Sequence, residues 1–153
     1  MMHADDVLVI IEDLAAVGVG VWLDGGWGVD ALVGEQTREH DDLDMVIALD
    51  QAGAARAALA AAGFVLTQDE SPRRFILCDA ADRRIDFHPV TFDARGMVCR
   101  GCRTAPASGT HRRDSAVQVL CHLGYPPDAN DRHDMRLLRD RCGANLPISF
   151  ECD

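Results

Sequence analysis

A short buried strand that runs directly into two glycines and then into a helix is the feature that most restricts how this chain can fold. Residues 19–23 are mostly β-branched or aromatic, which is typical of a buried strand. Helical spacing resumes at residues 27–33, just after Gly25 and Gly26. Glycine lets a ligand approach the backbone closely, and a helix N-terminus offers free N–H groups to an anion. The turn is therefore a candidate phosphate site.

A second strand predicted at residues 42–49 separates apolar from acidic side chains. Leu43 and Met45 point to one face, whereas Asp42 and Asp44 point to the other, ~6.5 to 7 Å apart at the backbone. Two carboxylates about 6 Å apart at an effective dielectric near 20 repel by about 2.8 kcal/mol, or roughly two pKa units. A divalent cation would offset this repulsion. The alternative is a solvated polar face, which is the more common explanation of an isolated Asp-x-Asp.

A third aspartate lies on another predicted strand, residues 84–90. Asp86 alternates with the apolar Ile85 and Phe87, so its side chain shares a face with Arg84 and His88. If this strand neighbours the first acidic strand, three aspartates meet at one place. Such a set suits one or two magnesium ions, which also take phosphate oxygens as ligands.

The remaining pattern predicts an α/β (α+β) fold with a mixed sheet flanked by helices and a short helical C-terminal part. We expect one domain over residues 1–153, with a core at about 1–92, a loop at about 93–113 and C-terminal helices at about 114–143. The other predicted elements are helices at 5–17, 27–33, 51–62, 115–124 and 130–141, and strands at 64–67 and 74–78, the latter forming a hairpin with 84–90.

The composition restricts how the protein can bind phosphate and which partners it suits. All 15 basic residues are arginine, so a Walker A loop and a lysine Schiff base are excluded, and arginine, backbone N–H groups or metal must hold any phosphate. The net charge of −10 argues against a nucleic-acid partner and suits a cationic small molecule or a metal-borne phosphate, although plain solubility explains it too. No apolar run reaches transmembrane length and the N-terminus lacks a cationic start, so we expect a cytoplasmic protein without a membrane partner.

The six cysteines do not form a recognisable framework. Cys99 and Cys102 have the spacing of a zinc-ligand pair, but a second spaced pair is missing from the sequence. We expect reduced thiols and assign this pair no role.

One extended pattern connects the glycine turn with the acidic strand. It reads Gly-Gly-Trp, an aspartate three residues on, and Thr-Arg-x-His running into Asp-x-Asp, and consists here of Gly25, Gly26, Trp27, Asp30, Thr37, Arg38, His40, Asp42 and Asp44. This segment resembles the antibiotic nucleotidyltransferases of the DNA polymerase β superfamily, chiefly the small lincosamide nucleotidyltransferases and next the aminoglycoside 2″-nucleotidyltransferases. Residues 85–89 resemble the lincosamide branch, and residues 119–138 are also similar.

The resemblance implies a reaction. ATP or another nucleoside triphosphate would bind with magnesium on Asp42, Asp44 and Asp86, its phosphates near Gly25 and Gly26. An antibiotic hydroxyl would attack the α-phosphate and pyrophosphate would leave. Asp86 would act as general base, as metal ligand or as both.

Two further residues of the pattern have alternative interpretations. Arg38 and His40 would contact the triphosphate, or Arg38 would pair with an aspartate and His40 would be hydrogen-bonded in the core. A packing role is favoured for Trp27 and a helix-positioning role for Asp30. Structural roles are also favoured for three histidines, which are His88, His122 and His133.

The acceptor is less determined than the reaction. A lincosamide is favoured slightly, an aminoglycoside is the first alternative, and a protein or metabolite acceptor is the next. A non-catalytic nucleotide-binding or antitoxin-like partner is the remotest, because such a copy would be expected to lose one of the three aspartates. Residues 93–113, which help shape the acceptor pocket in the family, do not match it. Small members of the family tend to pair, so the resemblance also implies a homodimer.

Overall fold

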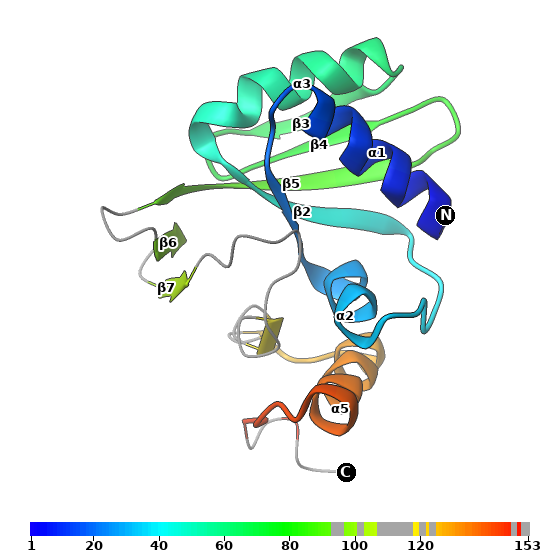
Figure 1. Ribbon diagram of the computed structural model, residues 1–153, viewed down its shortest axis with the longest axis vertical. Helices are drawn as coiled ribbons and strands as arrows, with labels where there is room; N and C mark the ends of the chain where they lie inside the picture. Colours follow the sequence, from blue (N-terminus) through cyan, green and yellow to red (C-terminus); the bar gives the residue numbers. More distant parts are fainter. Residues whose placement is uncertain are drawn as a thin grey trace.

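The computed structural model describes residues 1–92, 97–100, 103–106, 118–119, 122, 125–147 and 150. Its elements follow the order helix, strand, helix, strand, helix, a run of five strands, and a last helix (Figure 1). They are α1 (Ala4–Ala16), β1 (Val21–Leu23), α2 (Gly25–Val33), β2 (Asp42–Ala48), a 3-10 turn (Leu49–Gln51), α3 (Ala52–Ala61), β3 (Val65–Glu70), β4 (Arg74–Cys78), β5 (Arg84–Phe92), β6 (Met97–Arg100), β7 (Arg103–Pro106) and α5 (Ala129–Cys142).

The sheet is mixed, as the sequence predicts. Its main strands run in the order β1-β2-β5-β4-β3. The pair β2 and β5 is parallel, whereas β1 with β2, β4 with β5, and β3 with β4 are antiparallel. The parallel pair requires a crossover, which α3, β3 and β4 supply. This crossover places the two acidic strands side by side in the middle of the sheet.

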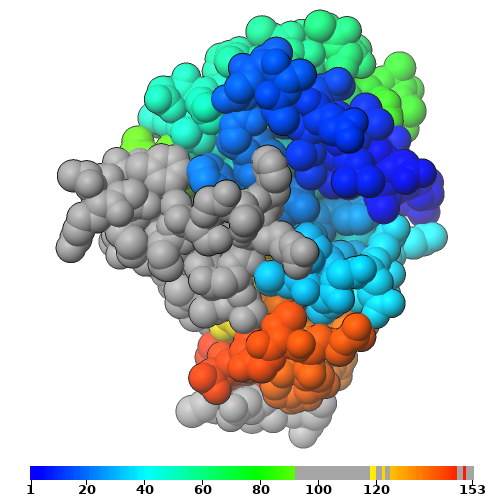
Figure 2. All heavy atoms as spheres, in the orientation of Figure 1, coloured from blue at the N-terminus to red at the C-terminus, as the bar shows by residue number. Residues whose placement is uncertain are grey.

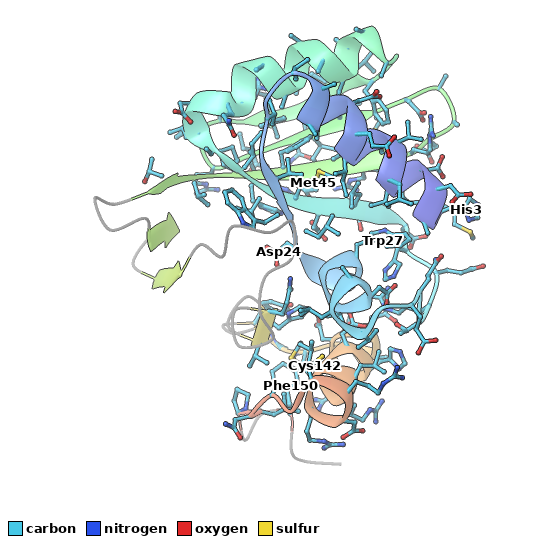
Figure 3. All side chains as sticks on the ribbon, in the orientation of Figure 1. His3, Asp24, Trp27, Met45, Cys142 and Phe150 are labelled. Atoms are coloured by element: carbon cyan, nitrogen blue, oxygen red, sulfur yellow. The ribbon has the colours of Figure 1, made fainter. Side chains whose placement is uncertain are left out.

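One face of the sheet carries the main core. Leu43, Met45 and Ile47 of β2 are fully buried there, together with Ile85 and Phe87 of β5. The helices α1 and α3 cover this face, and Figure 3 shows Met45 beneath α1. The predicted alternation of both strands is therefore confirmed, and it leaves their aspartates on the opposite face.

A second, smaller core joins α2 to α5 on the other side of the sheet. Val29 of α2 packs with Met135 and Leu138 of α5, and Phe150 completes the cluster near Cys142 (Figure 3). Figure 2 shows the orange surface of α5 directly against the cyan segment that follows α2. The helix α5 ends at a left-handed glycine, Gly143, as predicted. The C-terminal helix is thus attached beside the face of the sheet that carries Asp42, Asp44 and Asp86, which we call the acidic face.

The structure differs from the predicted loop at 93–113. Strand β5 extends to Phe92 and pairs with β6, which pairs in turn with β7. Strands of four residues are too short for alternation to be readable, which explains the difference.

Part of the C-terminal prediction stays untested. The helix predicted at 115–124 lies mostly outside the described residues, and so do Cys102 and the side chain of Cys99. Among the described residues, no helix combines the length and apolar character needed to cross a membrane.

Candidate active site

The acidic face is built by the register of the two parallel strands. Asp44 of β2 is the direct partner of Asp86 on β5, and Asp42 is the partner of Arg84. Asp86 is buried and both aspartates of β2 are partly buried. The three predicted carboxylates therefore lie on adjacent strands and on one face, which is the arrangement that the sequence predicts for neighbouring strands.

His88 belongs to the same cluster. Its Nε2 lies 3.3 Å from Asp44 Oδ1 and 3.6 Å from Asp86 Oδ1. Ligand atoms of these three side chains all fall within 4.8 Å of one another. Carboxylate oxygens and an imidazole nitrogen are donors for divalent cations. Asp42, the other predicted ligand, lies one position along the same face of β2, outside this tight group.

The pKa of Asp42 reflects how crowded this face is. Burial raises the pKa of its carboxyl above the usual value, and the negative charges of Asp44 and Asp86 raise it further. Arg84 opposes the shift. The charged form of Asp42 is thus disfavoured in the protein alone, and a bound cation would relieve that cost.

The glycine turn lies against the acidic face. Gly25 has a positive φ of 58°, and a β-carbon there would come within 2.6 Å of Asp44 Oδ2. A β-carbon on Gly26 would collide with the Arg38 guanidinium and the His40 ring. Both positions therefore require glycine, and the start of α2 is brought next to a candidate metal ligand.

Asp30 fixes the connection that leads from α2 into β2. Its Oδ1 accepts hydrogen bonds from the Thr37 backbone N–H at 3.1 Å and from Thr37 Oγ1 at 2.6 Å. Its Oδ2 lies 2.5 Å from His40 Nε2, and the His40 ring lies against Trp27 at 4.5 Å between centroids. These contacts agree with a packing role for Trp27 and a positioning role for Asp30, and they favour the structural interpretation of His40.

Arg38 ties the same connection to α5. Its Nε and Nη2 donate to the two carboxylate oxygens of Asp134, at 3.1 and 2.8 Å. Its Nη1 donates to the Glu39 carbonyl at 3.1 Å. Asp134 is buried, and this pairing raises the pKa of Arg38. Each nitrogen of the guanidinium is thus engaged within the protein, which favours the pairing interpretation of Arg38 over direct contact with a triphosphate.

A polar cavity of about 250 Å³ opens beside these groups. The glycine turn, Asp42 and Asp44 line one side, and Tyr125 and Asp131 from the C-terminal part line the other. The Tyr125 hydroxyl donates to Asp131 Oδ1 at 3.1 Å, and partial burial together with the negative charge of Asp131 raises the pKa of Tyr125 well above its usual range. The cavity therefore lies between the acidic face and the segment that leads into α5.

Most of the chain matches the profile of a known protein family. Residues 6–138 match the profile of the aminoglycoside-2''-adenylyltransferase family. The chain belongs to this family. It is accordingly an enzyme of the nucleotidyltransferase type.

Individual relatives of this adenylyltransferase-family chain fall into two groups. A lincosamide resistance protein from Staphylococcus haemolyticus is 26% identical over 152 residues, covering 88% of this chain and 92% of the relative. A 2''-aminoglycoside nucleotidyltransferase from Klebsiella pneumoniae is 30% identical over 92 residues, covering 58% of this chain and 51% of the relative.

Solved structures show the same two groups. The lincomycin-bound crystal structure of the lincosamide antibiotic adenylyltransferase LnuA superposes with a TM-score of 0.77 at 25% identity, covering 91% of this chain and 98% of that one. The complex of ANT(2'')-Ia with adenylyl-2''-tobramycin gives a TM-score of 0.63 at 18% identity, covering 90% and 88%. The second likeness is one of fold alone.

Sequence reasoning missed one side chain that directly contacts the predicted carboxylates of this adenylyltransferase-family chain. Arg74, at the start of β4, donates from Nε to both oxygens of Asp86 at 2.9 Å, and its Nη2 also contacts Oδ2. The predicted hairpin could have revealed this contact. When Ile76 is opposite Asp86, as in the structure, Arg74 lies two residues away and shares the face of Asp86. Parity places His88 on the right face, although the sequence favours a structural role for it.

Proposed function

We propose that this enzyme transfers a nucleoside monophosphate from ATP or another nucleoside triphosphate to a hydroxyl of an antibiotic, with a lincosamide as the first candidate. The observation that carries the proposal is the parallel register of Asp44 with Asp86, with Gly25 packed against Asp44. It unites an oxygen donor set for cations, a helix N-terminus for phosphate and a candidate base in one place.

The residues fit a magnesium site. Asp42, Asp44 and Asp86 present hard oxygen donors. Burial, followed by the negative charges of Asp44 and Asp86, raises the pKa of Asp42, and a bound cation would offset the cost of keeping its carboxylate charged. Magnesium held there would supply polarisation of the phosphoryl oxygens, the Lewis-acid contribution common to such transfers.

The protein's own groups would perform the remaining tasks. The N-terminus of α2, at Gly25 and Gly26, would receive the phosphates through its backbone N–H groups. Asp86 would take the proton from the attacking hydroxyl as the oxygen forms a bond to the α-phosphorus and the bond to pyrophosphate breaks. In this account Arg38 and His40 contribute to nucleotide binding by holding the turn rather than by touching the triphosphate.

The choice of acceptor rests on the relatives. The lincosamide resistance protein matches over nearly its whole length, and the lincomycin-bound enzyme has the higher TM-score, which supports a lincosamide. The family description and the shorter match to an aminoglycoside enzyme support an aminoglycoside as the second candidate. Both drug classes carry basic amines, which suit an acidic cavity lined by Asp42, Asp44 and Asp131. The homodimer implied by the resemblance is also a proposal, which sedimentation velocity would test.

A substrate panel tests the proposal. The protein is incubated with magnesium, one of four nucleoside triphosphates, and each of several lincosamides and aminoglycosides. We expect pyrophosphate release together with a drug whose mass has increased by one nucleoside monophosphate, most strongly with ATP and a lincosamide. An adduct formed only on aminoglycosides would shift the assignment to the second candidate. No adduct on any drug would exclude an antibiotic acceptor.

A further inference from the structure

The Arg74–Asp86 pair lies at the centre of the acidic face, yet the proposed reaction gives Arg74 no task. The side chain of Asp86 is only 3% exposed, whereas that of Arg74 is 34% exposed. A buried carboxylate needs a compensating charge, and the fork of Arg74 supplies it with hydrogen bonds to both oxygens. A second guanidinium, that of Arg84, is more distant, with its Nη2 3.9 Å from Oδ2.

The two oxygens of Asp86 have different surroundings. Oδ2 accepts from both Nε and Nη2 of Arg74. Oδ1 accepts from Nε and lies 3.6 Å from His88 Nε2, which is itself 3.3 Å from Asp44 Oδ1. A carboxylate oxygen can accept more than one hydrogen bond, so Oδ1 retains capacity beside His88. Oδ2 thus accepts two hydrogen bonds from Arg74, whereas Oδ1 accepts one and lies beside His88, the side chain that also approaches Asp44.

We propose that Arg74 is the positioning residue of Asp86: it holds Oδ2, leaves Oδ1 on the side of His88, and shares the charge of this carboxylate with the divalent cation. This inference rests on the proposed function, because it takes the Asp44–Asp86 cluster as the cation site. In the absence of a cation, Arg74 is the main counter-charge. When a cation binds, the positive charge of Arg74 opposes it at short range.

Two variants separate the charge of Arg74 from its geometry. Arg74→Gln removes the charge, so the buried carboxylate becomes more costly without a cation and attracts a cation more strongly. Arg74→Lys keeps the charge but replaces the planar fork by a single flexible ammonium group, so Asp86 is balanced but less well oriented. Arg56→Gln is the matched control, since Arg56 is similarly half-buried and also forms a two-bond pair, but with Asp69 of β3 instead of a predicted metal ligand.

The first measurement needs no substrate. Mn²⁺ binding is followed by calorimetry, and thermal unfolding is recorded with and without Mn²⁺. We expect Arg74→Gln to have a lower Tm without cation and a Mn²⁺ affinity about tenfold higher than the wild type. Arg56→Gln should bind Mn²⁺ like the wild type, whereas Arg74→Lys, which keeps the charge but orients Asp86 less well, should bind it no more tightly than the wild type. An unchanged or weaker affinity in Arg74→Gln would overturn the shared-charge inference.

Loss of folding would also be informative. If Arg74→Gln shows no cooperative transition without a cation, Mn²⁺ should restore one, because the cation replaces the missing counter-charge. Failure of Mn²⁺ to restore the fold would count against the inference.

The second measurement concerns orientation. With any acceptor that the wild type modifies, Arg74→Lys should lower kcat by about tenfold or more while the KM for ATP changes by less than about threefold. A wild-type kcat in Arg74→Lys would overturn the positioning role. If the wild type modifies no drug, the proposed function fails, whereas the Mn²⁺ measurements still decide whether Arg74 and the cation share Asp86.

Discussion

Gly25 and Asp44 are packed so closely that a β-carbon on the glycine would lie 2.6 Å from the carboxylate Oδ2. The contact joins the turn at the start of α2 to the centre of β2. It also keeps the candidate phosphate site next to the candidate cation site.

Replacing Gly25 by alanine should therefore damage the site more than the fold. Gly18→Ala is the matched control, because Gly18 also has a positive φ, 77°, but a β-carbon added there would meet no described atom within 4 Å. In both variants the free energy of unfolding should fall by about 1–2 kcal/mol, because alanine is strained in the left-handed backbone conformation. Only Gly25→Ala should also displace Asp44 and reduce kcat by about a hundredfold or more. Equal kcat values in the two variants would contradict this interpretation of the contact.

The Arg38–Asp134 pair yields a prediction about nucleotide binding. Asp134 is buried, so Asp134→Asn should lower the free energy of unfolding by about 2 kcal/mol. If Arg38 acts through this pair, Arg38→Gln and Asp134→Asn should raise the KM for ATP by similar factors, and the double variant should be no worse than either. Asp140→Asn, which alters an exposed pair, should leave Tm and KM unchanged.

A much larger effect of Arg38→Gln than of Asp134→Asn on the KM for ATP would contradict this account. It would show that Arg38 contacts the triphosphate directly. The two interpretations are thus separated by kinetics on single substitutions and their combination.

Asp42 makes stability depend on pH with a defined sign. Its pKa is raised above the usual 3.8, chiefly by burial, so the native state binds the proton more tightly than the unfolded state. The free energy of unfolding therefore falls as pH rises from 3.8 through the raised pKa, and the cost persists at neutral pH. Asp42→Asn should be more stable than the wild type at pH 7 without metal, with the difference vanishing below that interval.

Chemical denaturation across the pH range, with and without Mg²⁺, measures this effect. Mg²⁺ should stabilise the wild type more than Asp42→Asn, because the cation relieves a repulsion that the variant lacks. A variant that is less stable than the wild type at pH 7 without Mg²⁺ would refute the prediction.

Elements that alternate clearly can be predicted from the sequence. The spacing of Leu43, Met45, Ile85 and Phe87 predicts strands β2 and β5, and parity alone places Asp86 on the right face. Long-range pairing is harder to predict. The Arg38–Asp134 bond joins residues 96 positions apart, so no local pattern indicates which aspartate Arg38 would choose.

Two features of the structure, the hairpin of β6 and β7 and the contact of Arg74 with Asp86, cannot be predicted from the sequence pattern alone. The hairpin of β6 and β7 is too short for its alternation to be distinguished from a loop. Arg74 can be placed from the register of the predicted hairpin, since Cys78 pairs with Arg84 and Ile76 with Asp86. The alternation of side chains along the strand places Arg74 on the correct face, but it does not show how far this flexible side chain extends toward the buried carboxylate of Asp86.

The central claim is that the aspartates of β2 and β5 carry out nucleotide transfer, and one comparison tests it most directly. Adduct formation on lincomycin is measured by mass spectrometry with ATP and Mg²⁺ for the wild type, for Asp44→Asn, and for Asp50→Asn, an exposed aspartate just after β2. We predict an adenylyl adduct with the wild type and Asp50→Asn, and a rate at least about a thousandfold lower with a folded Asp44→Asn. A wild-type rate in Asp44→Asn would contradict the account.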